Sequence, residues 1–425
     1  MKKTLLFVAI ALIGFTSCAQ KKTAESNQNT TKTEVTVDPS QIISLYFDDD
    51  LMREAKKAIE AGDPAIMPLF NSFKKNTDAK YLNMKPVSIV EGKKRTAPSR
   101  DPRDYISLSP YWWPDPDSDT GIPYVRNDGV RNPEVYDFVE RTIGGTMGDA
   151  TQSLAMMYYF TGDEKYAAKA ADFLREWFLD PVTGMNPNLT FAQYVPGMER
   201  IRGTGVMEAR TVSSGLNAAQ IISSSKSWTA EDEAALKDWA IAFRYWIENS
   251  SHGQAEAMSQ NNHGLWYEAY REAVTMYTGD YTRLRDMIVA DQLPRLPKQI
   301  AKDSTMPHEI ARTLGLHYTT FSLSAVNRTN IMAKKIGVPV WDYTGANGRN
   351  MSWGIDYVIP YWKEPSKWPH MQIKPISTSS AAVVLYHVGK ELNNQAYSDL
   401  AMEFGLPAPR GAAGVTDILY YKMIK

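Results

Sequence analysis

The sequence predicts an all-α fold in which helical hairpins stack into a ring or a solenoid, with one long irregular interruption. Apolar residues recur three and four positions apart along most of the chain, and glycine–aspartate pairs separate the segments that carry this pattern. The chain has 425 residues, of which 43% are hydrophobic and 22% are charged. This composition excludes wholesale disorder and suffices for one large domain or two ordinary ones.

The first helices are predicted over residues 51–59 and 66–73, and the clearest helical hairpin spans residues 150–178. Within this hairpin, Gly162 suits the left-handed position that follows a helix, and Asp163 suits the N-cap of the next one. Repeated units of this kind are typical of stacked hairpins. The same pattern of a turn glycine between two helices recurs at residues 61–64 and 278–280 and, more weakly, at residues 388–390.

Residues 93–132 interrupt the helices, because seven prolines lie within residues 98–133. An irregular excursion of this length inside a compact domain is usually functional. Trp112 and Trp113 lie side by side in it, and aromatic faces among cations suit an acidic polysaccharide groove. The alternative is that the two tryptophans wedge the loop onto the helices. The cations of this segment are Lys93, Lys94, Arg95, Arg100, Arg103, Arg126 and Arg131.

The formal net charge is −1 and no long basic run occurs, which argues against a nucleic-acid partner. Binding of an acidic partner therefore requires a local cluster of arginine and lysine side chains. One cysteine and six histidines exclude a disulfide framework and a cysteine-based metal site, and no zinc-protease, serine-hydrolase or P-loop motif occurs. Asp104, Asp128 and Glu134, in the region of the irregular segment, leave a glycoside hydrolase open.

Residues 1–17 are predicted to be a signal peptide, because two lysines precede an apolar run over residues 5–15 that is too short to span a bilayer. The small residues before Cys18 resemble a bacterial lipobox, in which the cysteine is lipidated and becomes the first mature residue. Residues 18–40 are then the lipidated cysteine and a polar, flexible tether. We expect a periplasmic lipoprotein that contacts the outer membrane only through its lipid. Secretion without an anchor and display on the cell surface are the alternatives.

Two further segments concentrate polar and aromatic side chains. Residues 261–267 place two amides and His263 directly before an aromatic-rich helix. Residues 309–318 bring an arginine, a histidine and a tyrosine into one short run. Each segment alone is a weak signal, because a lone histidine or tyrosine at helical spacing is more often a core residue than a catalyst.

Five motifs occur in order along the chain: YISLSPYWWPDP at residues 105–116, WFLDP and MNPNL within residues 177–189, NNHG at residues 261–264, and LHY at residues 316–318. Together they resemble the alginate lyase domain of polysaccharide lyase family 5 and its relatives, with family 38 the closest. The resemblance covers about residues 45–375. It implies an (α/α) barrel or toroid of six or seven helical hairpins with a long irregular active-site loop. Residues 41–425 would then be a single catalytic domain.

The resemblance also implies cleavage of a polyuronate, alginate in the first place, by β-elimination that leaves an unsaturated uronate end. Tyr318 would protonate the leaving O4 and, where both events occur on one face of the sugar, also act as the base. Asn262, His263 and Arg312 would neutralise the substrate carboxylate. Arg312 is also expected to lower the pKa of Tyr318, although it lies six residues before this tyrosine instead of the seven of family 5. The scheme requires no metal and no cofactor.

The substrate is an anionic polysaccharide in this interpretation, and several alternatives stay open. One is a glucuronan lyase of the same mechanism, since mannuronate and glucuronate differ only in configuration at C2. Others are an (α/α) barrel glycoside hydrolase that uses two carboxylates of the loop and a non-catalytic lipoprotein that holds polyuronate. The expected substrate-binding residues are Tyr111, Trp112, Trp113, Arg103, Arg131, Gln193 and His317.

Overall fold

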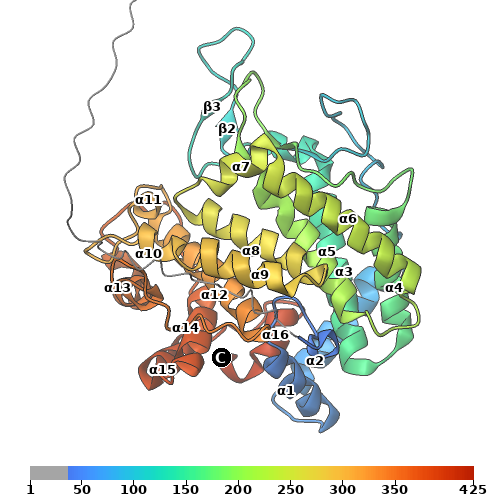
Figure 1. Ribbon diagram of the computed structural model, residues 1–425, viewed down its shortest axis with the longest axis vertical. Helices are drawn as coiled ribbons and strands as arrows, with labels where there is room; N and C mark the ends of the chain where they lie inside the picture. Colours follow the sequence, from blue (N-terminus) through green and yellow to red (C-terminus); the bar gives the residue numbers. More distant parts are fainter. Residues whose placement is uncertain (1–36) are drawn as a thin grey trace, which may run out of the picture. The chain divides into compact units, whose positions relative to one another are not determined.

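Helices make up most of the structure, a computed structural model that describes residues 37–425 (Figure 1). The predicted helices at residues 51–59 and 66–73 are confirmed as α1 and α2. The α-helices are α1 (Asp49–Glu60), α2 (Met67–Thr77), α3 (Val139–Thr161), α4 (Glu164–Leu174), α5 (Ala209–Ile221), α6 (Ala230–Asn249), α7 (Ser251–Ala257), α8 (Asn262–Tyr277), α9 (Tyr281–Met287), α10 (Arg295–Gln299), α11 (Pro307–Ile310), α12 (Gly315–Lys335), α13 (Met351–Lys363), α14 (Ser379–Glu391), α15 (Gln395–Phe404) and α16 (Val415–Leu419).

Five helices form an inner row in which each contacts the next, namely α3, α5, α8, α12 and α14 (Figure 1). Helices that follow them in the chain pack outside this row: α4 against α3, α13 against α12, and α15 against α14, while α6 packs against α8. Nearly every residue of α8 is buried, whereas α6 and α15 bury only one face. This alternation of inner and outer helices confirms the predicted (α/α) toroid class.

The strongest predicted hairpin turn is confirmed at the end of α3. Gly162 has φ 68°, a left-handed conformation that glycine adopts without strain, and its amide donates to the carbonyl of Tyr158 over 2.7 Å. The carboxylate of Asp163 then accepts from the amide of Lys165 and caps α4. The turns predicted at residues 61–64 and 278–280 have the same left-handed glycine.

The weaker turn predicted at residues 388–390 is wrong, because α14 continues through it to Glu391. The chain turns later, where the side chain of Asn394 caps α15 by accepting from the amide of Tyr397. Gly389 instead lies where α14 packs against α15. A Cβ at this position would lie 2.6 Å from Oγ and 2.7 Å from the backbone nitrogen of Ser398, so glycine allows α15 to approach α14 closely.

The irregular segment predicted over residues 93–132 contains no helix, and three short strands lie in it. Strand β1 (Ile106–Leu108) pairs in parallel with β4 (Phe191–Tyr194), while β2 (Trp112–Trp113) pairs antiparallel with β3 (Val125–Arg126). The segment therefore carries Trp112 on a strand instead of a free loop. It also has a small apolar core of its own, formed by Ala97, Ile106, Leu108, Val135 and Phe138.

The predicted signal peptide over residues 1–17, the lipidation site Cys18 and the tether up to residue 36 lie outside the described residues. The chain that follows docks on α5, where the hydroxyl of Ser44 and the amide of Leu45 donate to Oδ1 of Asn217 over 2.7 and 2.8 Å. No helix in residues 37–425 combines the length and the apolar character that crossing a membrane requires.

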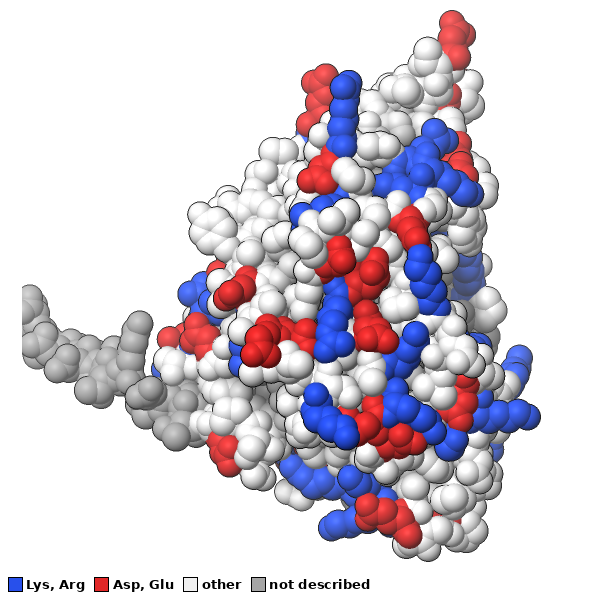
Figure 2. All heavy atoms as spheres, turned by 90° about the vertical axis from the view of Figure 1, so that its right-hand side faces the viewer, with Lys and Arg blue, Asp and Glu red and all other residues white. Residues whose placement is uncertain are grey.

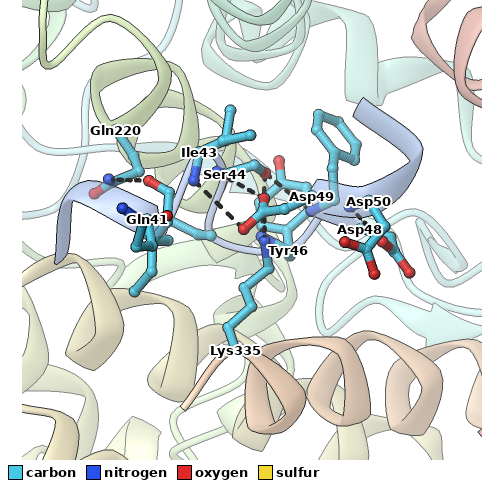
Figure 3. Close-up of polar contacts among 12 residues, drawn as sticks. Gln41, Ile43, Ser44, Tyr46, Asp48, Asp49, Asp50, Gln220 and Lys335 are labelled. Carbon is cyan, nitrogen blue, oxygen red and sulfur yellow. Dashed lines mark hydrogen bonds and ion pairs between the residues drawn. The ribbon is translucent and has the colours of Figure 1, made fainter. Parts of the chain in front are cut away.

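A buried ion pair fastens this N-terminal segment to the inner helix α12 (Figure 3). The carboxylate of Asp49 accepts from the amides of Ile43 and Ser44, over 3.4 and 3.2 Å, and forms an ion pair with the ammonium group of Lys335. Burial raises the pKa of Asp49 and lowers the pKa of Lys335, in each case against the attraction of the partner. Each charge therefore depends on the other for its compensation.

We expect Asp49→Ala to reduce the free energy of unfolding by about 3–5 kcal/mol, because it leaves Lys335 buried without a partner. Urea unfolding followed by circular dichroism measures this loss. The control is Asp50→Ala on the neighbouring, more exposed position, whose surface ion pair with Arg53 is worth about 0–1 kcal/mol. Equal midpoints for the two variants would contradict the assigned role of the buried pair.

Candidate active site

A cavity of about 730 Å³ lies where the irregular segment, residues 193–210 and the first turns of α8 and α12 meet. All four residues predicted to be catalytic line it, namely Asn262, His263, Arg312 and Tyr318. The two amides and the histidine come from the start of α8, and the tyrosine comes from the first turn of α12. Contact between these two inner helices brings the two sequence segments together.

Asp128 and Tyr318 hold the guanidinium of Arg312 between them. Nη2 of Arg312 donates to the hydroxyl of Tyr318 over 3.0 Å, and the guanidinium carbon lies 4.0 Å from the centre of the phenol ring. Nε and Nη2 also donate to the two carboxylate oxygens of Asp128, over 3.0 and 2.8 Å. Burial alone would raise the pKa of Asp128, but Arg312 lowers it below its ordinary value. Asp128 is therefore ionised and orients Arg312.

Arg312 acts to lower the pKa of Tyr318, as expected, but it does not bring this pKa down toward neutral pH. Burial raises the pKa of Tyr318 above its ordinary value, and the hydrogen bond to Tyr111 raises it further, while Arg312 only opposes this rise. The hydroxyl oxygens of Tyr318 and Tyr111 are 3.4 Å apart. Tyr318 is therefore a neutral phenol at neutral pH, which is the form that donates a proton.

His263 is oriented by a buried carboxylate. Its Nδ1 lies 2.6 Å from Oε1 of Glu256, a residue of α7 that is 2% exposed. Its backbone amide donates to the side chain of Asn261, the N-cap of α8. Because a carboxylate only accepts, Nδ1 carries a proton, and in the neutral ring Nε2 keeps its lone pair. His263 can therefore accept a proton through Nε2.

Asn262 is fixed by a second buried carboxylate. Its backbone nitrogen and Nδ2 donate to the two oxygens of Glu309, over 2.5 and 2.7 Å, and the hydroxyl of Ser322 donates to the same group over 3.1 Å. Burial raises the pKa of Glu309, although these hydrogen bonds oppose the rise. One hydrogen of the Asn262 amide stays available for an acidic ligand.

The two tryptophans of the irregular segment have different surroundings. Trp112 and Tyr111 line the cavity, and the guanidinium of Arg202 lies 4.8 Å from the centre of the Trp112 ring. Trp113 is not among the residues that line it, and its Nε1 donates to the carbonyl of Val130 over 3.0 Å. Neighbouring residues of a strand point to opposite faces, so β2 presents only Trp112 to the cavity.

Gln193 and His317, predicted to bind substrate, both line the cavity. Gln193 has φ 51°, a strained conformation for a residue with a side chain, and such strain concentrates at functional sites. The ring of His317 is stacked on Phe321 with 6.0 Å between ring centres. Burial, with the charge of Arg312, lowers the pKa of His317, so this ring is neutral at neutral pH.

Arg103 and Arg131, also predicted to bind substrate, do not line this cavity. Nε of Arg103 donates to the carbonyl of Gly184 over 2.6 Å, so this cation braces the backbone. Arg131 is exposed at the surface. The structure thus places these two cations of the irregular segment away from the tyrosine and the histidine.

The three carboxylates that allowed the alternative of a glycoside hydrolase form other hydrogen bonds. Asp104 accepts from Nδ2 of Asn186 over 2.8 Å, Glu134 accepts from the hydroxyl of Tyr124 over 2.5 Å, and Asp128 holds the arginine described above. These three carboxylates are not among the residues that line the cavity. Within residues 37–425, no group of three or more histidine, cysteine or acidic side chains is arranged to hold a metal ion.

Sequence reasoning missed most of the positive charge of the cavity. Among the described residues, two glutamates line it, and both are engaged: Glu208 with Arg141, over 3.1 Å, and Glu256 with His263. Only Arg126 and Arg312 had been singled out, because the other arginines sit in no motif. The arginines that line the cavity are Arg126, Arg141, Arg200, Arg202, Arg210, Arg312 and Arg328.

Several solved structures have a similar fold. An alginate lyase from Bacteroides ovatus is 33% identical, has a TM-score of 0.82, and matches over 89% of this chain and 98% of that chain. Alginate lyase A1-III from Sphingomonas species A1 has a TM-score of 0.58 over 92% of this chain and 98% of that one. A variant of A1-III complexed with a tetrasaccharide has a TM-score of 0.59. Both A1-III structures are 15% identical, which shows the fold alone.

Fold and site together define a polysaccharide lyase of the (α/α) toroid class. The family model described as alginate lyase matches residues 89–368, about two thirds of the chain, and the chain belongs to this family. The closer placement with family 38 stays a prediction. No match was found among curated proteins.

We expect Asp128→Asn to lower kcat about tenfold with little change in KM, because a charge-assisted hydrogen bond is worth roughly 1.5–3 kcal/mol and its loss frees Arg312 from its orientation. Steady-state kinetics on a polyuronate substrate measures the change. Asp128→Glu should recover part of the activity, since it keeps the charge. Asp119→Asn, an exposed change in the same segment, is the matched control. Unchanged kcat in Asp128→Asn would show that Arg312 needs no such partner.

Proposed function

We propose that this polysaccharide lyase cleaves alginate by β-elimination. The observation that carries the proposal is that a neutral tyrosine and a carboxylate-oriented histidine line one arginine-rich cavity. The 33% identical relative from Bacteroides ovatus is an alginate lyase, which favours the same substrate here. Glucuronan, which differs from polymannuronate at C2, is the alternative substrate of the same chemistry.

The first step requires neutralisation of the substrate carboxylate, because removal of the C5 proton adds a second negative charge to the group. The amide of Asn262 can donate to this carboxylate. The imidazole of His263 can do so only when Nε2 also carries a proton, because the proton on Nδ1 is bound to Glu256. Arg312 contributes less directly than predicted, since Nε and Nη2 already bind Asp128. Its main contact in the cavity is with Tyr318.

The proton transfers then divide between two side chains. The base takes the C5 proton, the electrons of the C5–H bond form the C4–C5 double bond, and the bond from C4 to O4 breaks. Tyr318 donates its proton to the leaving O4, for which its raised pKa keeps it protonated. Nε2 of His263 is the base when the C5 proton lies on the face opposite O4, as in guluronate.

We expect Tyr318→Phe to abolish cleavage of mannuronate and guluronate blocks alike, because the leaving oxygen always needs a proton. His263→Ala should remove guluronate activity and leave part of the mannuronate activity, since there the proton and O4 share one face and Tyr318 can serve both. That residual activity should rise with pH, because only the phenolate of Tyr318 accepts a proton and its raised pKa makes the phenolate scarce at neutral pH.

The measurement is the ultraviolet absorbance of the C4–C5 double bond on purified blocks and on glucuronan, with circular dichroism as the folding control. Reducing ends without absorbance would identify a hydrolase, and binding without either would identify a non-catalytic protein. Robust activity of Tyr318→Phe would remove the tyrosine from the mechanism. Equal losses on both blocks for His263→Ala would leave the histidine as a neutraliser of the carboxylate only.

We also propose that the protein is a lipoprotein anchored at the periplasmic side of the outer membrane. The apolar run over residues 5–15 and the small residues before Cys18 support this proposal, and Lys21 and Lys22 differ from an acidic surface-export signal. Cys18→Ala should abolish incorporation of a labelled fatty acid and shift the protein to the soluble fraction. A wild-type protein without label would refute the anchor, and accessibility to added protease in intact cells would place it on the surface.

A further inference from the structure

A pair of arginines lines the catalytic cavity away from the proton-transfer residues. Arg328 lies on α12, ten residues after Tyr318, which is about 15 Å along the helix axis at a rise of 1.5 Å per residue. Arg210 lies in the first turn of α5. This spacing along α12 favours a role for Arg328 in binding a uronate other than the one whose bond breaks at Tyr318.

The guanidinium of Arg328 is held by aromatic rings and not by a carboxylate. Its carbon lies 3.5 Å from the centre of the Tyr46 ring and 5.6 Å from that of Tyr270, and Nη2 donates to the hydroxyl of Ser213. Nε of Arg328 is buried and has no hydrogen-bond partner in the part of the chain that the structure describes. A fixed guanidinium with an unused donor is prepared for an anionic ligand.

Arg210 adds a second charge to the same region. Arg210 and Arg328 line the same cavity, and the charges of both lower the pKa values of Tyr46 and Tyr270 against the effect of burial. Neither arginine forms an ion pair within residues 37–425. The acidic group that faces this region is Glu208, and Arg141 and the hydroxyl of Tyr105 already engage it.

Arg328 also marks the inner limit of the catalytic cavity. A second cavity of about 370 Å³ shares Arg328 with the first and is lined by Tyr46 and Asn327 on its own side. The stacked pair of Arg328 and Tyr46 therefore stands between the two cavities.

We propose that Arg210 and Arg328 form an inner subsite that binds the carboxylate of a uronate unit remote from the bond that is cleaved. Two guanidinium groups offer a carboxylate paired, charge-assisted hydrogen bonds, and a bound carboxylate would supply the counter-charge that neither arginine finds in an ion pair within residues 37–425. The subsite thus selects chains in which sugars beyond the reacting one are also acidic. This inference rests on the proposed lyase function and adds a requirement on substrate length.

The test compares kcat/KM on oligomannuronates of increasing length. In the wild-type protein we expect kcat/KM to rise in one step when the chain becomes long enough to reach Arg328. Arg328→Gln should remove this step through a KM that is about tenfold higher for long chains, with unchanged KM for short ones. Arg328→Lys should restore part of the step, since it keeps the charge and loses the planar fork.

Two further variants test whether the effect is specific to the arginines of the cavity. Arg210→Gln should give a smaller loss of the same length-dependent kind without a folding defect, since this side chain lies exposed in the cavity and forms no ion pair within residues 37–425. Arg410→Gln, a change of the same type on an exposed arginine outside the cavity, should leave every length unchanged. Losses that are equal for short and long chains in both cavity variants would overturn the inner subsite.

Binding separates this inference from the proposed function. Calorimetric titration of long and short oligomannuronates into the wild-type and Arg328→Gln proteins with the Tyr318→Phe change measures affinity without turnover. Length-dependent affinity that Arg328→Gln removes would support the subsite even if the wild-type protein formed no double bond. Absorbance from wild-type turnover without any length-dependent difference in affinity would support the lyase and overturn the subsite.

Discussion

The ion pair between Asp128 and Arg312 joins the two parts of the molecule on which the site depends. Asp128 belongs to the irregular segment, and Arg312 immediately precedes the inner helix that carries Tyr318. Through this pair the segment fixes the guanidinium, and the guanidinium fixes the hydroxyl of the tyrosine. The same contact brings Tyr111 to the tyrosine and Trp112 to the cavity. The position of the Tyr318 hydroxyl therefore depends on the conformation of the irregular segment.

Charge is distributed differently outside and inside the protein. On the face shown in Figure 2, basic and acidic side chains intermingle, in keeping with a net charge of −1. The cavity gathers arginines instead, and their proximity contributes, after burial, to a lowered pKa of about 10 for Arg202. Such crowding is unfavourable until an anionic chain supplies the opposite charges. Selectivity for polyuronates over neutral polysaccharides follows from this difference, with no need for a basic protein surface.

The helical hairpins could be predicted because their turns depend on local signals, and the proposed reacting residues because they lie in short motifs that carry the family resemblance. The left-handed Gly162 ends a helix by its own backbone preference, and His263 belongs to a short motif. The partners that orient the site could not be predicted, since Asp128 meets Arg312 only after the chain has folded over 184 residues. The choice of Trp112 over Trp113 depends on the face of a two-residue strand, and no periodicity can be read from two residues.

In the proposed mechanism, environment separates the roles of the two side chains that carry protons. Burial keeps the proton on Tyr318, and Arg312 offsets only part of this effect because its charge is shared with Asp128. A carboxylate fixes the proton of His263 on Nδ1, which leaves the opposite nitrogen basic. Two titratable groups in different surroundings can have different pKa values, so that one acts as an acid and the other as a base at the same pH. The cavity achieves this with one phenol withdrawn from water and one imidazole held by Glu256, so loss of either environment, and not only of either side chain, removes the division of labour.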